Sequence, residues 1–220
     1  MGHVLFQYCN ESLEAINIGL TVEPDDSVLS ICGCGAQPLS FLEYISEGNV
    51  TAIDNNPTAI RLAQTALRHI TQKNYSTLRH MALAPRDGYY FDPERAARIA
   101  KNQAKIHFVQ LDVRNQPTLK GPFSKAYFSN ARVRLDLYAP LFSEGALIYL
   151  TIPPITHLPD EDMMGFLSRI YKANPADFDL IHDRSEISRT IEKETLLAFR
   201  KGRKLRMYWR PAILRKLTAH

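Results

Sequence analysis

Short apolar runs alternate along the chain with longer segments in which apolar side chains recur every three or four residues. The runs 28–32, 50–53, 106–111, 126–128 and 146–151 have the length and composition of buried β-strands. The segments 11–20, 38–46, 57–70, 133–142 and 160–173 have the spacing of amphipathic helices. This alternation predicts an α/β fold with a mostly parallel sheet and helices on both faces.

Two segments depart from the alternation. Segment 74–105 is an insertion, with aromatic residues around a Pro-Arg-Asp-Gly turn and then a helix-like stretch, 93–101. Segment 178–214 is ambiguous, and its runs 196–200 and 204–209 predict an antiparallel hairpin that turns at Lys201–Gly202. We expect a single domain, 1–220, in which the N-terminal helical segment 1–24 and the insertion 74–105 are candidates for a substrate cap.

Composition narrows the class of protein. A chain of 220 residues that is 45% hydrophobic can bury the core of one globular domain. Its net charge of +4 is too small to indicate nucleic acid by itself. The three cysteines match neither a disulfide framework nor a metal site, so no metal is expected. No secretory or membrane-spanning segment is visible, which predicts a soluble, cytoplasmic protein.

Polar residues follow four of the predicted strands. The loop 32–37 leaves the first strand, Asp54 and Asp112 end the next two, and Ser129 and Asn130 end the fourth. Because the carboxyl ends of parallel strands meet at one edge of a sheet, these residues should converge on one ligand site near the switch in strand order.

The chemistry of this edge suits an adenosine-bearing cofactor. Gly33 and Gly35 let ligand atoms approach the backbone, and Asp54 follows at the distance, roughly 20 residues, of an acid that binds a ribose diol. Sites for nicotinamide dinucleotides and for S-adenosylmethionine (SAM) share both features. Pro38 stands where the G-x-G-x-x-G pattern has its third glycine, which favours SAM. In the alternative interpretation, Gly35 is a turn residue, Asp54 is a helix cap and Asp112 is an acid in a turn.

Two segments resemble those of the class I SAM-dependent methyltransferases. Asp54-Asn55-Asn56-Pro57 resembles their acidic-x-Asn-Pro segment, and Asp112 resembles the third-strand acid that accepts a hydrogen bond from the adenine amino group. The resemblance implies a Rossmann-like fold, SAM as cofactor, and S-adenosylhomocysteine or 5′-methylthioadenosine as product. It implies these cofactor-binding residues: Cys32, Gly33, Cys34, Gly35, Gln37, Asp54, Asn55, Asp112, Val113 and Ser129.

The chain departs from that pattern at two places. Ser30 occupies the position of the usual first-strand acid. The segment 128–132 replaces the Asn/Asp-Pro-Pro-Tyr box that grips amide or base nitrogens, which disfavours methylation of nucleobases or glutamine.

A narrower resemblance covers the runs VLSICGCGAQPLSFLE and TAIDNNPTAIRLAQ. These look like the SAM:diacylglycerol 3-amino-3-carboxypropyl transferases of betaine-lipid synthesis. The stretch 8–12 is similar to that family's aromatic-rich segment with an acid, although Asn10 replaces its tryptophan. This resemblance implies transfer of the aminocarboxypropyl group of SAM.

We therefore expect a SAM-dependent transferase that methylates a small molecule. The alternatives are aminocarboxypropyl transfer to a lipid-like or small acceptor and a non-catalytic SAM-fold binding protein. The candidates for catalysis are Tyr8, Glu11 and Asn130, and the candidates for substrate contacts are Tyr89, Tyr90 and Arg132.

Two further features each have two interpretations. Glu11 binds the cofactor's ammonium or acts as a base; the favoured alternative is a solvated acid in the first turn of a helix. The basic stretch 201–216 contacts anionic lipid or RNA, or, as favoured, forms the solvated edge of the sheet. The oligomeric state is not predicted.

Overall fold

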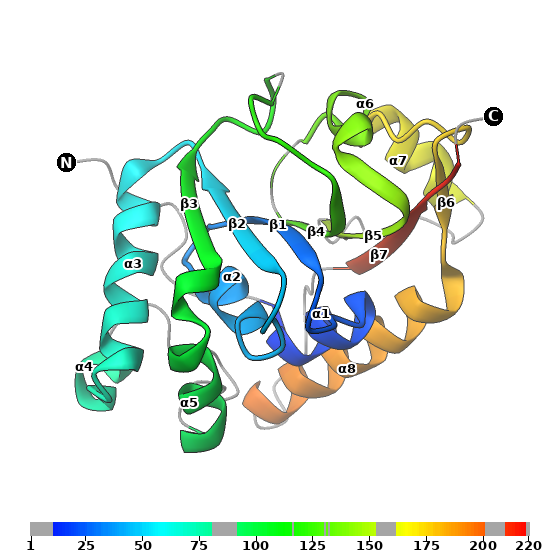
Figure 1. Ribbon diagram of the computed structural model, residues 1–220. Helices are drawn as coiled ribbons and strands as arrows, with labels where there is room; N and C mark the ends of the chain where they lie inside the picture. Colours follow the sequence, from blue (N-terminus) through cyan, green and yellow to red (C-terminus); the bar gives the residue numbers. More distant parts are fainter. Residues whose placement is uncertain are drawn as a thin grey trace.

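One mixed sheet forms the centre of the molecule (Figure 1). The computed structural model describes residues 11–80, 92–115, 117–129, 131, 133–152, 162–200 and 210–218. The strand order is β3-β2-β1-β4-β5-β7-β6, and β7 runs opposite to the other six strands, so its pairings with β5 and β6 are antiparallel. The strands are β1 (Ser27–Ile31), β2 (Asn49–Asp54), β3 (Ile106–Gln110), β4 (Phe123–Ser129), β5 (Phe142–Ile152), β6 (Phe178–Leu180) and β7 (Arg210–Lys216). The predicted α/β class and the mostly parallel sheet are confirmed.

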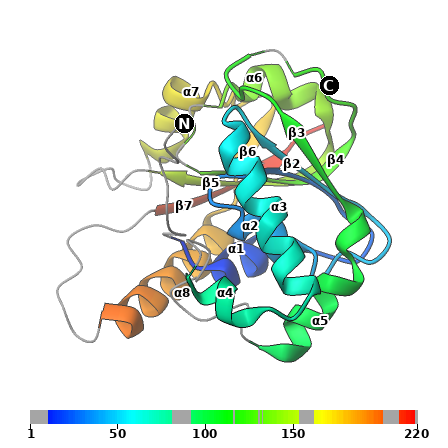
Figure 2. The ribbon, with the colours of Figure 1, turned by 90° about the vertical axis from the view of Figure 1, so that its left-hand side faces the viewer.

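Helices cover both faces of the sheet, as predicted (Figure 2). The helices are α1 (Leu13–Leu20), α2 (Ala36–Phe41), α3 (Pro57–Thr71), α4 (Tyr75–His80), α5 (Pro93–Lys101), α6 (Leu135–Tyr138), α7 (Met163–Tyr171) and α8 (His182–Arg200). Helices α6 and α7 pack on one face, and α1, α2, α3, α5 and α8 on the other. Tyr127 and Phe128 are neighbours on β4 and enter the cores of opposite faces, as the alternation of a strand requires.

Helix boundaries follow the capping residues. Asn56 accepts a hydrogen bond from the Thr58 N–H (2.9 Å) and Pro57 occupies the first turn, so α3 begins where the sequence predicts. Helix α2 begins two residues before the predicted Pro38, because Gly35 in the left-handed region (φ 89°) is its N-cap. It ends at Phe41 rather than at residue 46.

The sequence prediction of a helix over 133–142 is too long. Of residues 133–142, which the structure describes in full, only Leu135–Tyr138 are α-helical. Ala139–Leu141 form a 3₁₀ turn, η3. Pro140 has no N–H to continue the helical hydrogen bonds, so the chain tightens and enters β5 at Phe142.

The predicted hairpin over 196–209 is wrong in its first half. Residues 196–200 are the end of α8, and the strand that pairs antiparallel with β5 and β6 is Arg210–Lys216. The second half, 204–209, and the turn at 201–202 lie outside the described residues. The helix escaped prediction because its inner face carries buried polar residues, Ser185, Ser188 and Glu192.

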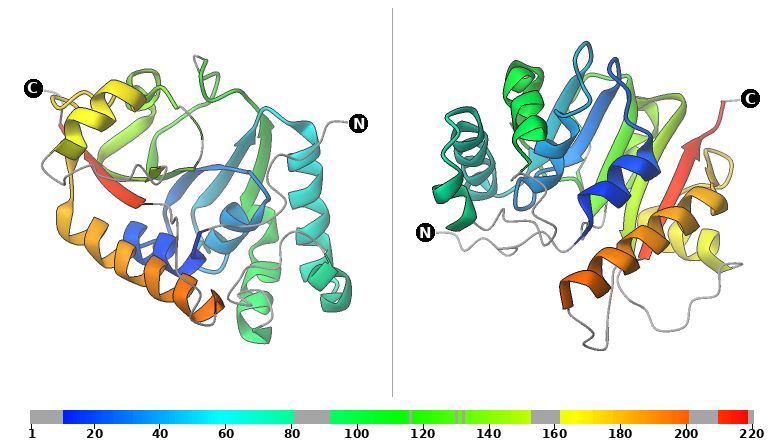
Figure 3. Two further views of the ribbon diagram at one scale, coloured as in Figure 1. Left: turned by 180° about the vertical axis from the view of Figure 1, so that it is seen from behind. Right: turned by 90° about the horizontal axis from the view of Figure 1, so that it is seen from below.

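These polar residues form hydrogen bonds with the elements that α8 covers. Ser188 Oγ donates to the Ala15 carbonyl (3.2 Å), and Glu192 Oε2 accepts from the Ser12 N–H (2.5 Å). Helices α1 and α8 therefore lie side by side (Figure 3). Gly19 permits this approach: a Cβ there would lie 2.4 Å from Ser188 Oγ and 2.9 Å from Tyr149 Cε2.

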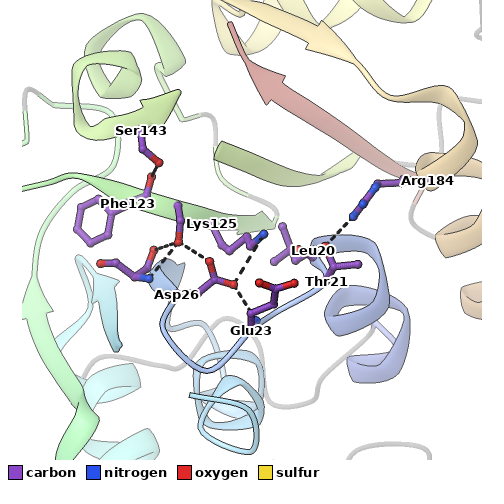
Figure 4. A network of polar contacts seen from close by, with 10 residues as sticks. Leu20, Thr21, Glu23, Asp26, Phe123, Lys125, Ser143 and Arg184 are labelled. Carbon is purple, nitrogen blue, oxygen red and sulfur yellow. Dashed lines mark hydrogen bonds and ion pairs between the residues drawn. The ribbon is translucent and has the colours of Figure 1, made fainter. Parts of the chain in front are cut away.

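A second polar network joins the amino ends of β1 and β4 (Figure 4). The buried Asp26 carboxylate accepts from the Glu23 N–H (2.8 Å) and from Ser124 Oγ (2.6 Å), with Lys125 Nζ 3.7 Å away. This network holds together the amino ends of the strands, and the predicted ligand site lies at their carboxyl ends. Its role is therefore structural.

We predict opposite effects of Gly→Ala in two helices. Gly19→Ala should lower the free energy of unfolding by about 1–3 kcal/mol, because the new methyl overpacks the α1–α8 contact. Gly165→Ala, in α7 with nothing within 4 Å of its Cβ position, should raise it by up to about 1 kcal/mol through helix propensity. Urea unfolding of both variants tests this; equal effects would contradict the close packing at Gly19.

Candidate functional site

The loop after β1 is held by the neighbouring strand β2. The Cys32 N–H donates to the Ile53 carbonyl (2.7 Å), and the Gly33 N–H donates to Asp54 Oδ2 (3.0 Å). Gly35 packs against α3 so closely that a Cβ would lie 2.6 Å from the Cβ of Ala63. Only glycine therefore fits at position 35.

Gly33 serves the loop in a different way. Its φ of 53° is left-handed, and no atom of the described residues lies within 4 Å of the position that a Cβ would take. The backbone at Gly33 thus faces open space at the carboxyl end of β1. A ligand can approach the main chain at this point, as a cofactor site at the switch between β1 and β4 requires.

Asp54 is the half-buried acid at the end of β2. Its Oδ2 accepts from Gly33 and its Oδ1 from the Asn56 N–H (2.8 Å). Burial raises the pKa of its carboxyl, while hydrogen bonds from the backbone of Asn56, Gly33 and Asn55 act in the opposite direction. A carboxylate accepts about four hydrogen bonds, so capacity remains for a further donor such as a ribose hydroxyl.

Asp112 follows β3 and lies beside the end of β2. Arg114 binds its carboxylate through Nε (2.9 Å to Oδ1) and through its backbone N–H (3.0 Å). These hydrogen bonds, the side chain first, lower the pKa of Asp112 to about 2, and the Asn55 side chain also contributes. Asn55 and Asp112 are therefore brought together. Arg114 is largely exposed, so an adenine amino group would displace it at small cost.

The remaining predicted cofactor residues are more enclosed. Val113 is buried in the core cluster that contains Leu29 and Phe128. Cys32 and Cys34 are buried cysteines that are not joined by a disulfide. Burial, and next the charge of Asp54, raises the pKa of the Cys32 thiol far above its usual value, so this thiol stays protonated.

Glu11 is buried, and the favoured interpretation of a solvated helix acid is wrong. It precedes the N-cap Ser12 of α1 and is only 8% exposed. Its Oε2 accepts from Gln37 Nε2 (3.1 Å), and its Oε1 accepts from Ser129 Oγ. Burial raises the pKa of Glu11, while hydrogen bonds from Ser129, Gln37 and Tyr127 partly counteract this.

The Glu11 network links the two sides of the switch point. Gln37 lies in the first turn of α2, directly after the glycine loop, and Ser129 is the last residue of β4. Thr151 Oγ1, on β5, donates to Ser129 Oγ (2.7 Å). Glu11, Gln37 and Ser129 are thus joined at the carboxyl ends of the strands.

Several predicted residues lie outside the described chain. These are Tyr8, Tyr89, Tyr90, Asn130 and Arg132. The described parts of the insertion, α4 and α5, lie beside α3 at the end away from the carboxyl edge of β2 and β3 (Figure 1), and Glu43 binds Arg95 and Arg98 of α5 (2.8 and 2.6 Å). The substrate cap stays a prediction for the N-terminal segment 1–24 and for the insertion 74–105.

Sequence reasoning missed three residues of the site: Arg114, Tyr127 and Thr151. Arg114 follows Asp112 by two residues, a spacing that could have indicated an ion pair. Tyr127 and Thr151 stand within apolar strands, where the sequence gives no sign of their partners.

The described residues contain neither a cluster of metal ligands nor a membrane-spanning helix. No cluster of three or more His, Cys, Asp or Glu side chains with the arrangement of metal ligands occurs among them. None of the helices within the described ranges has the length and apolar character needed to cross a membrane.

Comparison with known proteins shows the fold. No protein-family model matches the chain, and no curated protein matches its sequence. The structure is similar to a precorrin-6y C5,15-methyltransferase from Geobacter metallireducens, with 9% identity, a TM-score of 0.53, and coverage of 94% of this chain and 87% of the other.

Two more solved structures share the fold. One is a SAM-dependent methyltransferase from Geobacter sulfurreducens in complex with S-adenosyl-L-homocysteine (13% identity, TM-score 0.54, coverage 100% and 95%). The other is the [4+2]-cyclase SpnF (12% identity, TM-score 0.52, coverage 94% and 80%). The chain therefore has the Rossmann-like fold of class I methyltransferases.

We predict that Glu11→Gln stabilises the ligand-free protein at neutral pH. The usual pKa of Glu11 is near 4.5 and burial raises it in the folded state, so the folded protein binds this proton more tightly than the unfolded chain. Stability from this group therefore falls as pH rises above about 4.5 through the folded pKa. Urea unfolding should show a gain for Glu11→Gln at pH 7.5 that shrinks toward pH 4.5. A gain that grows on acidification would contradict the assignment.

Proposed function

We propose that this protein is a SAM-dependent transferase and that it methylates a small molecule. One observation carries the proposal: the Asp54 carboxylate is tied to the Gly33 backbone at the switch point, with acceptor capacity remaining. A carboxylate so placed suits a ribose diol, and the open space above Gly33 suits the atoms attached to that ribose.

The neighbouring residues fit the rest of the cofactor. Asp112 lies one strand beyond Asp54, where its carboxylate can accept from an adenine amino group after Arg114 moves. The loop 32–35 and Gln37 lie on the other side of Asp54, and the proposal assigns them to the part of the cofactor beyond the ribose. Asn55, Val113 and Ser129 complete the proposed contacts. The sheet also differs from the 3-2-1-4-5-6 order of dinucleotide-binding folds, because β7 stands between β5 and β6.

The chemistry needs little acid–base assistance from the protein. A bound SAM supplies an electrophilic carbon and a good leaving group. The roles of the chain are to hold the ribose at Asp54, to orient the cofactor over the loop, and to align the acceptor with the carbon that is transferred. A general base is needed only for a weakly nucleophilic acceptor. Tyr8, Asn130, Tyr89, Tyr90 and Arg132 remain candidates on the acceptor side.

Two other activities use the same cofactor site. The local resemblance of the first two strand segments favours aminocarboxypropyl transfer as the second candidate, in which the γ-carbon of the methionine portion faces the acceptor. A neighbour named as a cyclase shares the fold, so fold alone does not set the reaction. Non-catalytic binding of SAM is the third candidate.

We predict that Asp54→Asn removes discrimination for the ribose. The parent protein should bind 5′-methylthioadenosine about tenfold more tightly than its 2′-deoxy analogue, because a hydrogen bond to a charged group is lost in the analogue. The Asn variant should bind both with nearly the same, weaker affinity. Isothermal titration calorimetry measures the four values, with NAD as a further ligand. Equal discrimination in parent and variant, or tighter binding of NAD, would sink the proposal.

A labelling experiment decides which group moves. We expect the acceptor fraction to gain the label from SAM that is labelled in the methyl carbon, and S-adenosylhomocysteine to accumulate. Label from the carboxypropyl carbons, with 5′-methylthioadenosine as the second product, would identify aminocarboxypropyl transfer instead. Binding of SAM without either product, across a panel of small-molecule extracts, would favour the non-catalytic candidate.

A further inference from the structure

We infer that one side of the molecule, formed by α3, α5 and β3, binds the phosphate backbone of a nucleic acid without reading its bases. We call this surface the β3 side. The inference goes beyond the proposed function and does not depend on it. Three observations support it: the distribution of charge along the chain, the exposure of basic side chains on this side, and the polar character of the residues between them.

Charge is distributed unevenly along the chain. Residues 1–60 contain eight acids and no lysine or arginine, whereas residues 61–110 contain nine lysines and arginines and three acids. The net charge of +4 therefore conceals a strongly basic segment. The described parts of this segment lie together, because β3 is an edge strand of the sheet and α3 contacts both α5 and β3 (Figure 2). A one-sided excess of positive charge is typical of a surface that binds a polyanion.

Helix α3 presents its basic residues to solvent. Its buried face is made of three alanines and Ile70, and the helix contains no Asp or Glu. Arg61 and Arg68 are exposed and lie on one face, because seven residues make about two turns. The exposed basic residues of the β3 side that form no ion pair with a described acid are Arg61, Arg68, Lys73 and Lys101.

Uncharged donors stand between these basic residues. Gln64 in α3, Gln72 directly after it and Gln103 after α5 are exposed, and their amides can donate to phosphate oxygens. The Arg61 side chain is oriented by its neighbour Thr58, because its Nη2 donates to Thr58 Oγ1 (3.0 Å). A guanidinium carries five N–H donors, so most of them remain for a phosphate.

A nucleic acid fits this side better than a bilayer or a second protein does. A helix that binds a bilayer inserts large apolar side chains, and a stable protein interface has an apolar core. The large hydrophobic side chains that are exposed in the described chain belong to α1, α7 and α8 instead; they are Ile18, Ile170 and Ile187.

The bases are not read on this side. Phe108 of β3 packs against the core, so the described part of the β3 side offers no Phe, Tyr or Trp ring on which a base can stack. The available groups are cations and amides, which suit phosphate oxygens of any sequence. Binding should therefore depend on salt and be independent of sequence.

The β3 side reaches the proposed cofactor site. Arg61 lies in the second turn of α3, and the N-cap of this helix, Asn56, donates its N–H to Asp54 Oδ1 (2.8 Å). Arg68 lies about 10 Å further along the helix axis. Phosphates follow one another at about 3.4 Å along each strand of a duplex, so the two arginines together can face several of them. A strand bound along α3 would run from the carboxyl edge of the sheet toward its amino edge.

Fluorescence anisotropy with a labelled oligouridylate tests the inference, using the full-length protein without SAM. We expect binding at about 0.1 M salt, with the logarithm of the association constant falling linearly as the logarithm of the salt concentration rises. Arg61→Glu combined with Arg68→Glu should weaken binding by at least about tenfold. It should also make this line less steep by about 1.4, because each phosphate contact to a single strand contributes about 0.7 to the slope.

The matched control combines Arg169→Glu with Lys193→Glu, which makes the same change in net charge at exposed positions of α7 and α8. It should change the affinity by less than about threefold, because neither position lies on the β3 side. Single-stranded DNA and duplex RNA as further probes show which nucleic acid is preferred, and oligoadenylate tests the independence from the base. Should the first variant not fold, as urea unfolding would show, Arg61→Gln with Arg68→Gln removes the charge without reversing it and should lower the slope by the same amount.

Several outcomes would overturn the inference. These are a parent protein that binds none of the nucleic acids, an equal loss of affinity in the α3 variant and the control, and a preference of more than about tenfold between oligouridylate and oligoadenylate. Tighter binding to anionic lipid vesicles than to any oligonucleotide would identify a bilayer instead, and self-association that the α3 variant abolishes would identify a second copy of the chain. Each of these leaves the proposed function standing, because the Asp54 experiment contains no nucleic acid.

Discussion

The hydrogen bond from the Gly33 N–H to the Asp54 carboxylate is the interaction on which the site depends. It ties the loop after β1 to the end of β2, while Gly35, pressed against Ala63, fixes where α2 begins. The backbone of the loop and the acid are therefore oriented before any ligand arrives. Preorganisation of this kind lowers the entropy that binding must overcome.

The three acids of this edge differ because their surroundings differ. Asp112 is held ionised by an exposed arginine, whereas burial raises the pKa of both Asp54 and Glu11. Asp54 keeps contact with solvent and has backbone donors, while Glu11 is enclosed by side chains from α2 and β4. These surroundings therefore leave the three carboxylates with different exposure and a different tendency to bind a proton.

The sequence predicts the strand ends around the site better than it predicts the burial of Glu11 beside them. The strand ends at Asp54, Asp112 and Ser129 follow from local apolar runs and from the parallel arrangement, so their convergence could be foreseen. The burial of Glu11 could not, because it depends on partners in α2 and β4 that lie far along the chain. Likewise α8 presents serines and a glutamate to the interior, where they form hydrogen bonds with Ser12, α1 and β7. These polar residues hide the periodicity that usually marks a buried helix face.

The contact between the Ser12 N–H and Glu192 has a consequence for how the protein matures. It joins residues 180 positions apart, directly beside the buried acid Glu11. A nascent chain that has not yet made α8 already contains the glycine loop and Asp54 but lacks the anchor for the segment that carries Glu11. The native position of Glu11 would then be reached only late in synthesis, after both ends of the domain have met.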